Sequence, residues 1–170
     1  MAYYDTHFNV ITAQKQLAKK ALLNSQSIVN MLVNTGNNVR EFETVDTGSK
    51  SPAAKLIKTH FWVPDTIVED KNFITMRSSV LYTDSNVVRE IGFSIYIICN
   101  NDQIDLLQGS RSDLLADAVD RILNNGDTPL FGLGGIELDT ANEVQFNSYY
   151  SGWELPYITH ERNREAKILG

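Results

Sequence analysis

Two neighbouring segments in the middle of the chain alternate apolar and polar residues, which is the period of a β-strand. They span residues 72–82 and 87–99, and the polar residues 83–86 between them are typical of a turn. The apolar residues of the second segment share one face: Val87, Ile91, Phe93, Ile95, Ile97 and Cys99. Both segments exceed the usual strand length of about five or six residues. The sequence therefore predicts a long hairpin whose tip projects beyond the body of the domain.

A helical period precedes this hairpin. Apolar residues recur at three- and four-residue steps across residues 12–33, and Thr12 stands where an N-cap is expected. Asn24 and Ser25 are poor helix formers, so a break in this helix is expected near them. A short helix is also predicted for residues 53–60, because a proline directly precedes them.

The same helical period returns after the hairpin, in residues 110–123. Ser110 followed by Asp113 outlines a capping box at the start, and the Asn-Gly pair at 125–126 is a typical helix end. One apolar stripe runs along this helix, formed by Leu114, Leu115, Ala118, Val119, Ile122 and Leu123. We expect the interface between sheet and helix to consist of Phe93, Ile95, Ile97, Leu115, Val119 and Ile122.

The remaining segments complete the predicted fold. Residues 34–52 are rich in Asn, Gly and Ser and predict a flexible excursion. A glycine turn at 131–135 leads into a strand at 136–139, and a last strand spans 149–157. Pro156 cannot donate to a ladder, so that strand is expected at a sheet edge. The order of elements predicts a single α+β domain over residues 1–170, with a mostly antiparallel twisted sheet packed against helices.

Charge is distributed unevenly along the chain, whose net charge is −6. Acidic residues dominate residues 101–147, whereas lysines dominate the first sixty residues. An acidic surface argues against proteins that track nucleic-acid phosphates, because these depend on clustered Lys and Arg. Two interpretations stay open: the opposite charges pair neighbouring copies in an assembly, or the acidic face is simply solvated and aids solubility. The single cysteine, Cys99, excludes an internal disulfide and fits synthesis in a reducing compartment.

No cofactor, metal or catalytic site is predicted. The glycines at 132–135 follow a helix and precede a strand, the reverse of a phosphate-binding loop. The histidines His7, His60 and His160 are scattered, with no pair at metal-ligand spacing. Asp113, Asp117 and Asp120 could be read as catalytic carboxylates, but their spacing favours a solvated or partner-facing stripe. We therefore expect a protein that is not an enzyme, with no apolar run long enough to span a membrane.

Contacts with other proteins are expected from the hairpin tip, the acidic stripe and the last strand. Tyr and Trp are enriched at protein–protein contacts, and the last strand holds three tyrosines and one tryptophan. The candidate interface residues are Asp84, Ser85, Asn86, Asp113, Asp117, Asp120, Tyr150 and Trp153.

Several stretches resemble head–tail connector proteins of tailed phages that infect Firmicutes, a family that includes tail terminators and tail-completion proteins. The stretches lie within residues 52–159. They read Phe61-Trp62-Val63-Pro64-Asp65-Thr66, Lys71-Asn72-Phe73-Ile74-Thr75, Arg111-Ser112-Asp113-Leu114-Leu115-Ala116-Asp117, Phe131-Gly132-Leu133-Gly134 and Tyr149-Tyr150-Ser151-Gly152-Trp153.

This resemblance implies a fold made of a helix, a twisted antiparallel sheet and a second helix packed on the sheet. It further implies a hexameric ring that caps the tail tube, stops tube growth and docks to the head-closure or connector protein. The partners implied are other copies of the chain, the tail-tube protein and that connector, while DNA passes through the lumen without specific binding. The protein would be assembled in the host cytoplasm and reside in the virion. A neck or head-closure protein (stopper or adaptor) of the same junction and a small non-viral binding module are the alternatives.

Overall fold

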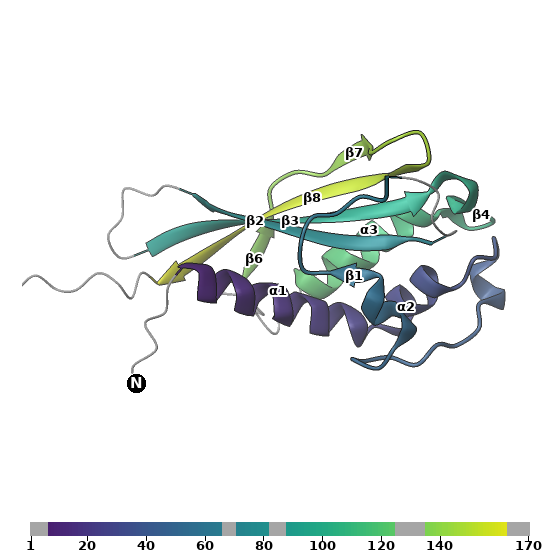
Figure 1. Cartoon of the computed structure of the whole chain (residues 1–170), viewed down its shortest axis with the longest axis horizontal. Helices are drawn as coiled ribbons and strands as arrows, with labels where there is room; N and C mark the ends of the chain where they lie inside the picture. The colour runs from purple at the N-terminus through teal and green to yellow at the C-terminus, as the bar shows by residue number, and fades with distance from the viewer. Residues whose placement is uncertain (1–6, 66–70, 82–87, 125–134, 163–170) are drawn as a thin grey trace, which may run out of the picture.

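In the part of the chain that the structure describes, a sheet lies over a layer of three helices (Figure 1). The computed structural model describes residues 7–65, 71–81, 88–124 and 135–162. The sheet has six strands in the order β1-β2-β3-β8-β6, and β7 also pairs with β8. The predicted α+β class, with a mostly antiparallel sheet packed on helices, is confirmed.

The bounds of the elements follow the chain order. The helices are α1 (His7–Leu23), α2 (Gln26–Val33) and α3 (Arg111–Leu123), and the 3-10 turns are η1 (Val39–Glu41), η2 (Pro52–Lys55) and η3 (Asn101–Gln103). The strands of the main sheet are β1 (Ile57–Lys58), β2 (Phe73–Leu81), β3 (Val88–Asn100), β6 (Ile136–Leu138), β7 (Asn142–Gln145) and β8 (Tyr150–Arg162). A small separate hairpin is formed by β4 (Asp105–Leu106) and β5 (Gly109–Ser110).

The predicted long hairpin is present as β2 and β3, of 9 and 13 residues. β8, also of 13 residues, runs antiparallel along the full length of β3. The first four residues of β2 are buried, whereas Arg77, Ser79 and Val80 near its other end are exposed. The turn with Asp84, Ser85 and Asn86 lies outside the described residues, so the projection of the hairpin tip beyond the domain stays a prediction.

The prediction that the last strand forms a sheet edge is wrong, because β8 has β3 on one side and β6 and β7 on the other. Pro156 is tolerated there for a local reason. It lies opposite the gap between β6 and β7, where its carbonyl accepts from the Asp139 amide at 2.9 Å. The N–H and C=O of one strand residue point to the same side, so the missing donor of Pro156 also falls in this gap.

Gly152 of β8 is required by a close approach of backbones. A Cβ at this position would lie 2.0 Å from the carbonyl oxygen of Ile97 on β3. Its φ of 156° is also one that side-chain-bearing residues rarely adopt. No other residue fits here without moving one of the two central strands.

The predicted first helix is divided at the expected place. α1 ends at Leu23 and α2 begins at Gln26, with Ser25 as N-cap accepting from the Ile28 amide at 3.5 Å. The predicted start at Thr12 is wrong, because the preceding residues contain no helix breaker and α1 already begins at His7. Breaking the helix lets both halves bury their apolar faces, which include Leu22 and Ile28.

The predicted helix at 53–60 is also wrong. Only the 3-10 turn η2 forms, after which β1 pairs in parallel with β2 at Ile74 and Thr75. The amide of Ile74 donates to the carbonyl of Leu56 at 3.0 Å. This pairing buries Leu56 and Ile57 in the core, so tertiary contact overrides local helix preference.

Residues 34–52 run back along the helices. Hydrogen bonds to the side chains of Asn30 and Asn34 and to the last residue of α1 hold them there. Asn34 exchanges two bonds with the backbone of Glu43, and the Asn30 side chain accepts from the Val45 amide. The Gly48 amide donates to the carbonyl of Leu23 at 2.8 Å. These bonds define the path of the segment in the structure; its flexibility in solution stays a prediction.

The core lies between the sheet and the three helices. All but one of the six residues predicted for the sheet–helix interface are fully buried, and Ile122 is half-buried. The opposite face of the sheet is closed at one end by residues 61–65. There the rings of Phe61 and Tyr96 lie 4.6 Å apart, and those of Trp62 and Phe73 lie 5.0 Å apart.

Arg111, the first residue of α3, is completely buried and binds four backbone carbonyls. Its Nη1 donates to Met31 and Asn34, its Nη2 to Gly36 and its Nε to Gln103, at 2.6–2.9 Å. Met31 and Asn34 belong to the end of α2, where helix carbonyls lack partners and carry partial negative charge. Burial lowers the pKa of Arg111 from its ordinary value, but a guanidinium remains charged in proteins.

Truncating a buried residue of α3 should reveal the sheet–helix interface. Leu115 is fully buried, so Leu115→Ala should lower the free energy of unfolding by about 2–5 kcal/mol through lost contacts and a cavity. Leu107, at the tip of the β4–β5 hairpin, is 71% exposed and is the matched control; Leu107→Ala should cost less than about 0.5 kcal/mol. Urea unfolding followed by circular dichroism measures both. Equal midpoints for the two variants would contradict the assigned packing.

Replacing Arg111 should be costly even with a residue of similar volume. Arg111→Met leaves four inward-facing carbonyls without donors, which should cost about 3 kcal/mol or more. Arg111→Lys should not restore stability, because an ammonium lacks the planar fork that reaches separate carbonyls. Arg121→Met on the same helix is the control and should change stability by less than about 0.5 kcal/mol, because its ion pair is exposed. An unfolding midpoint of Arg111→Met equal to that of Arg121→Met would refute this assignment.

Candidate functional site

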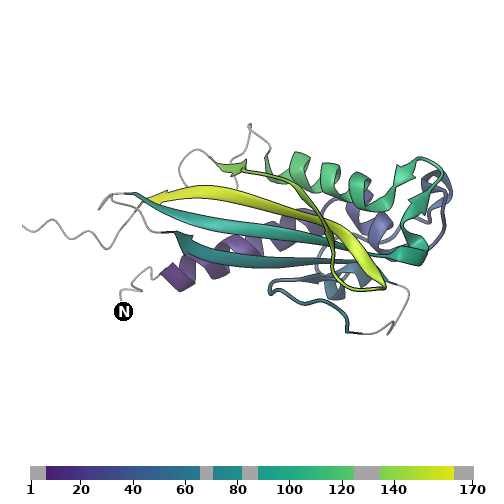
Figure 2. The same cartoon turned by 90° about the horizontal axis from the view of Figure 1, so that it is seen from above.

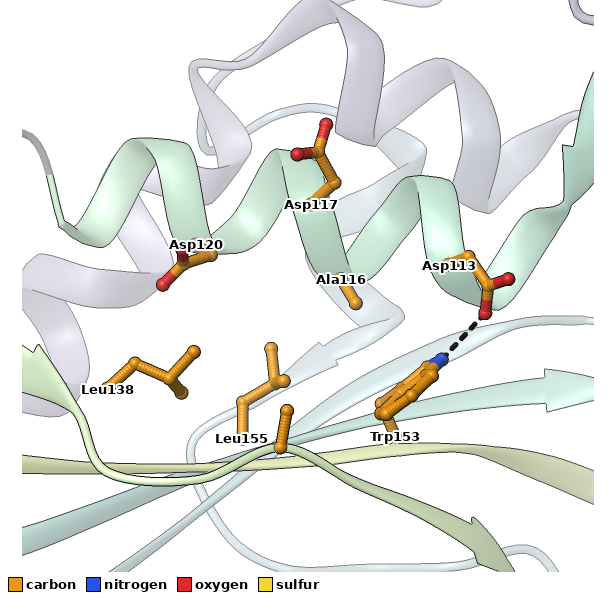
Figure 3. A pocket seen from close by; sticks show the side chains of 8 residues that line it. Asp113, Ala116, Asp117, Asp120, Leu138, Trp153 and Leu155 are labelled. Atoms are coloured by element: carbon orange, nitrogen blue, oxygen red, sulfur yellow. Dashed lines mark hydrogen bonds between the residues drawn. The ribbon is translucent and has the colours of Figure 1, made fainter.

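A groove lies between α3 and strand β8, closed on its outer side by the chain that joins β6 to β7 (Figure 3). Its volume is about 230 Å³. The floor is apolar and the helix side is acidic. The residues that line it are Asp113, Ala116, Asp117, Asp120, Leu138, Ala141, Trp153 and Leu155. Four of the predicted interface residues, the three aspartates and Trp153, are thus brought together here.

Two of the aspartates are fixed to β8. The indole Nε1 of Trp153 donates to Oδ1 of Asp113 at 2.7 Å, the bond drawn in Figure 3. The hydroxyl of Tyr157 donates to Oδ1 of Asp120 at 3.1 Å. Burial, and after it the neighbouring Asp120, raises the pKa of Tyr157 above its ordinary value, so this hydroxyl remains a donor. These bonds attach α3 to the sheet and set the width of the groove.

Asp117 differs from its two neighbours because it has no bond to the sheet among the described contacts. Its carboxylate meets Arg121 one turn later, with Oδ2 2.9 Å from Nη2. Both side chains are largely exposed, at 57% and 77%. The predicted stripe therefore divides into two carboxylates with a structural bond and one that is available to a partner.

The expected capping box at the start of α3 does not form. Ser110 is the N-cap residue, but its side chain makes no cap bond and its Oγ lies 2.7 Å from that of Ser112. Asp113 does not reach back to the N-cap, because it accepts from Trp153 instead. Trp153 lies forty positions after Asp113 in the sequence, so local sequence patterns could not predict this hydrogen bond.

Tyr150, another candidate interface residue, has no exposed surface in the subunit, and its place at an interface stays a prediction. It is fully buried, with its ring 6.3 Å from that of Phe73. Strand alternation places Tyr150 on the sheet face away from the helices. That face is covered at this end by residues 61–65, whose position the sequence pattern did not predict.

The remaining candidates for chemistry are inert or outside the site. Cys99 is buried under the helices, and burial raises the pKa of its thiol to about 12, which disfavours the reactive thiolate. Within residues 7–65, 71–81, 88–124 and 135–162, no group of three His, Cys, Asp or Glu side chains could hold a metal ion. Among the helices in these ranges, none has the length and apolar character needed to cross a membrane.

A second groove, of about 310 Å³, lies between the end of α1 and the turn at residues 48–49. It is basic, because Lys19 and Lys20 line it together with Leu23. Sequence reasoning did not single out this groove. The sequence feature that indicates a basic surface is the absence of any Asp or Glu from residues 7–33 and 47–60. These two ranges hold six lysines: Lys15, Lys19, Lys20, Lys50, Lys55 and Lys58.

The division among the aspartates can be tested by truncating two of them. Asp120→Ala removes the acceptor of the buried Tyr157 hydroxyl and should cost about 1–3 kcal/mol. Asp117→Ala, one turn earlier, breaks only an exposed ion pair and should cost less than about 0.5 kcal/mol. Thermal or urea unfolding compares the two. If they destabilise equally, the three carboxylates are equivalent after all.

Comparison with known proteins identifies a family for this chain. No curated protein matches the chain. The YomW family matches residues 25–159, a range that contains α2, α3 and most of β8. The phage origin of this family agrees with the coarser part of the resemblance seen in the sequence, whereas the match does not specify a tail terminator. The match covers well over half of the chain, which therefore belongs to the phage-derived YomW family.

Proposed function

We propose that the chain is a non-enzymatic structural protein of the phage head–tail junction, a tail terminator that forms a ring on the end of the tail tube. The ring would join the tail-tube protein to the head-closure protein in the virion. Membership of a phage-derived family supports the viral setting. The observation that carries the proposal is an open strand edge on β2.

This edge is long and accessible. β1 pairs with β2 only at Ile74 and Thr75, so the rest of β2 has no neighbour on its outer side in the part of the chain that the structure describes. An unpaired edge of this kind is a template for a strand from another copy. Arg77, Ser79 and Val80, which follow the buried half of β2, are exposed. A protein whose task is assembly can use such an edge, whereas a monomeric protein has to protect it.

The charge of the chain fits passage of DNA through a ring. The net charge is −6, and an acidic lumen repels the phosphate backbone, so that DNA moves through without adhering. The acidic groove also suits protein contacts better than catalysis. Two of its carboxylates already accept from Trp153 and Tyr157, and the third, Asp117, has only an exposed ion pair with Arg121.

The register of β2 provides a selective test of edge pairing. The Ile74 amide donates outward to Leu56, so alternate residues, Val80 among them, also direct their N–H outward. Val80→Pro should therefore remove an outward donor while leaving the bonds to β3 intact. Val80→Ala is the matched control, because it removes the exposed side chain but keeps the N–H.

Deletion of the gene from a phage that encodes this chain should yield separate heads and tails of irregular length. Complementation with wild-type protein or Val80→Ala should restore joined particles, and Val80→Pro should fail although it folds. Electron microscopy of lysates measures tail length and joining, and circular dichroism checks folding. Joined particles with normal tails in the deletion strain would exclude the proposal. Tails of normal length that remain separate from heads would favour the neck or head-closure alternative.

A further inference from the structure

The two long sides of the molecule carry opposite charge. α1 packs beside β1 and β2 at one side of the sheet, whereas α3 packs beneath β3 and β8 towards the other (Figure 2). On the α3 side, the acidic groove lies between Asp117 and the chain joining β6 to β7. On the α1 side are the lysines of α1, η2 and β1, here called the basic face: Lys15, Lys19, Lys20, Lys55 and Lys58.

Two cations of the basic face, Lys19 and Lys58, lie close to each other. Burial, and after it the charge of Lys58, lowers the pKa of Lys19 from its ordinary value. The ammonium of Lys19 donates to the carbonyl of Ala54 at 2.9 Å, and that of Lys58 lies 4.6 Å from the ring centre of Trp62. None of these lysines is in an ion pair among the described residues. A carboxylate from outside the subunit would relieve their mutual repulsion.

The acidic groove is the complementary surface. Its apolar floor of Ala116, Leu138 and Leu155 suits the aliphatic stem of a lysine, and the exposed carboxylate of Asp117 suits its ammonium. Because the two surfaces lie on different sides of one chain, contact between them joins copies head to tail. A contact of this type forms a ring where its rotation closes.

We infer that the acidic groove of one copy receives the basic face of the next, with Asp117 opposite Lys20 or Lys55. This deepens the proposed ring by naming the surfaces that join its copies, and it depends on that proposal. Asp117, Lys20 and Lys55 are exposed and have no bond to the core among the described contacts, so all three can be changed without disturbing the fold.

Charge reversal on each surface tests the contact. Sedimentation of the purified full chain at low ionic strength should give wild-type assemblies larger than a dimer, and added salt should return them to the 19.1 kDa monomer. Asp117→Lys alone and Lys20→Glu with Lys55→Glu should each raise the concentration for half-assembly at least about tenfold. An equal mixture of the two variants should assemble again, because each supplies the charge that the other requires.

Glu43→Lys is the matched control for Asp117→Lys. It makes the same change in net charge at an exposed residue that lines neither groove, and it should assemble like wild type. Circular dichroism confirms that each variant is folded. A wild-type chain that stays monomeric up to about 100 µM, or reversal variants that assemble like wild type, would overturn the inference. If Asp117→Lys assembles like wild type, the copies are joined by other surfaces, and the inference fails while the ring proposal stands. The phenotype of the gene deletion tests the ring proposal independently.

Discussion

The buried guanidinium of Arg111 is the constraint on which the arrangement of the helices depends. A cation with no contact to water normally pairs with a carboxylate, but here four carbonyl groups replace it. Two of them lie at the end of α2, where the aligned peptide dipoles favour positive charge. The start of α3 is thereby attached to the end of α2, and Asp113, two residues later, is placed where Trp153 can reach it. The acidic groove owes its position to this attachment.

β8 has a comparable role within the sheet. One of its faces supplies Trp153, Leu155 and Tyr157 to the groove and core, while the other carries the buried Tyr150 beneath the loop at residues 61–65. Helices cover one face of β8, residues 61–65 cover one end of the other, and strands pair on both of its sides, so β8 is well suited to be the rigid centre of the domain. The acidic groove is built on its Trp153 and Leu155, whereas the open edge of β2 lies beyond β3.

Periodicity in the sequence was sufficient for the long elements. The hairpin, α3 and the break near Ser25 were predicted because each depends on local alternation or on weak helix formers. The helix at 53–60 and the edge position of Pro156 were mispredicted because strand pairing decided both, and pairing joins residues distant in sequence. The charged residues show the same limit. No pattern in the sequence distinguished Arg111 from a surface charge, because its four acceptors lie in two distant stretches, residues 31–36 and Gln103.

Gly152 has a consequence for how the chain finds its register. A slip of β8 along β3 by one residue would turn its apolar side chains to the wrong face and is excluded by burial. A slip of two residues keeps the faces correct, so burial alone discriminates poorly against it. Such a slip would bring Tyr150 or Glu154 to the place where a Cβ meets the Ile97 carbonyl. The absence of a side chain at Gly152 therefore favours one register of β8 against β3 over the other registers that bury the same apolar residues.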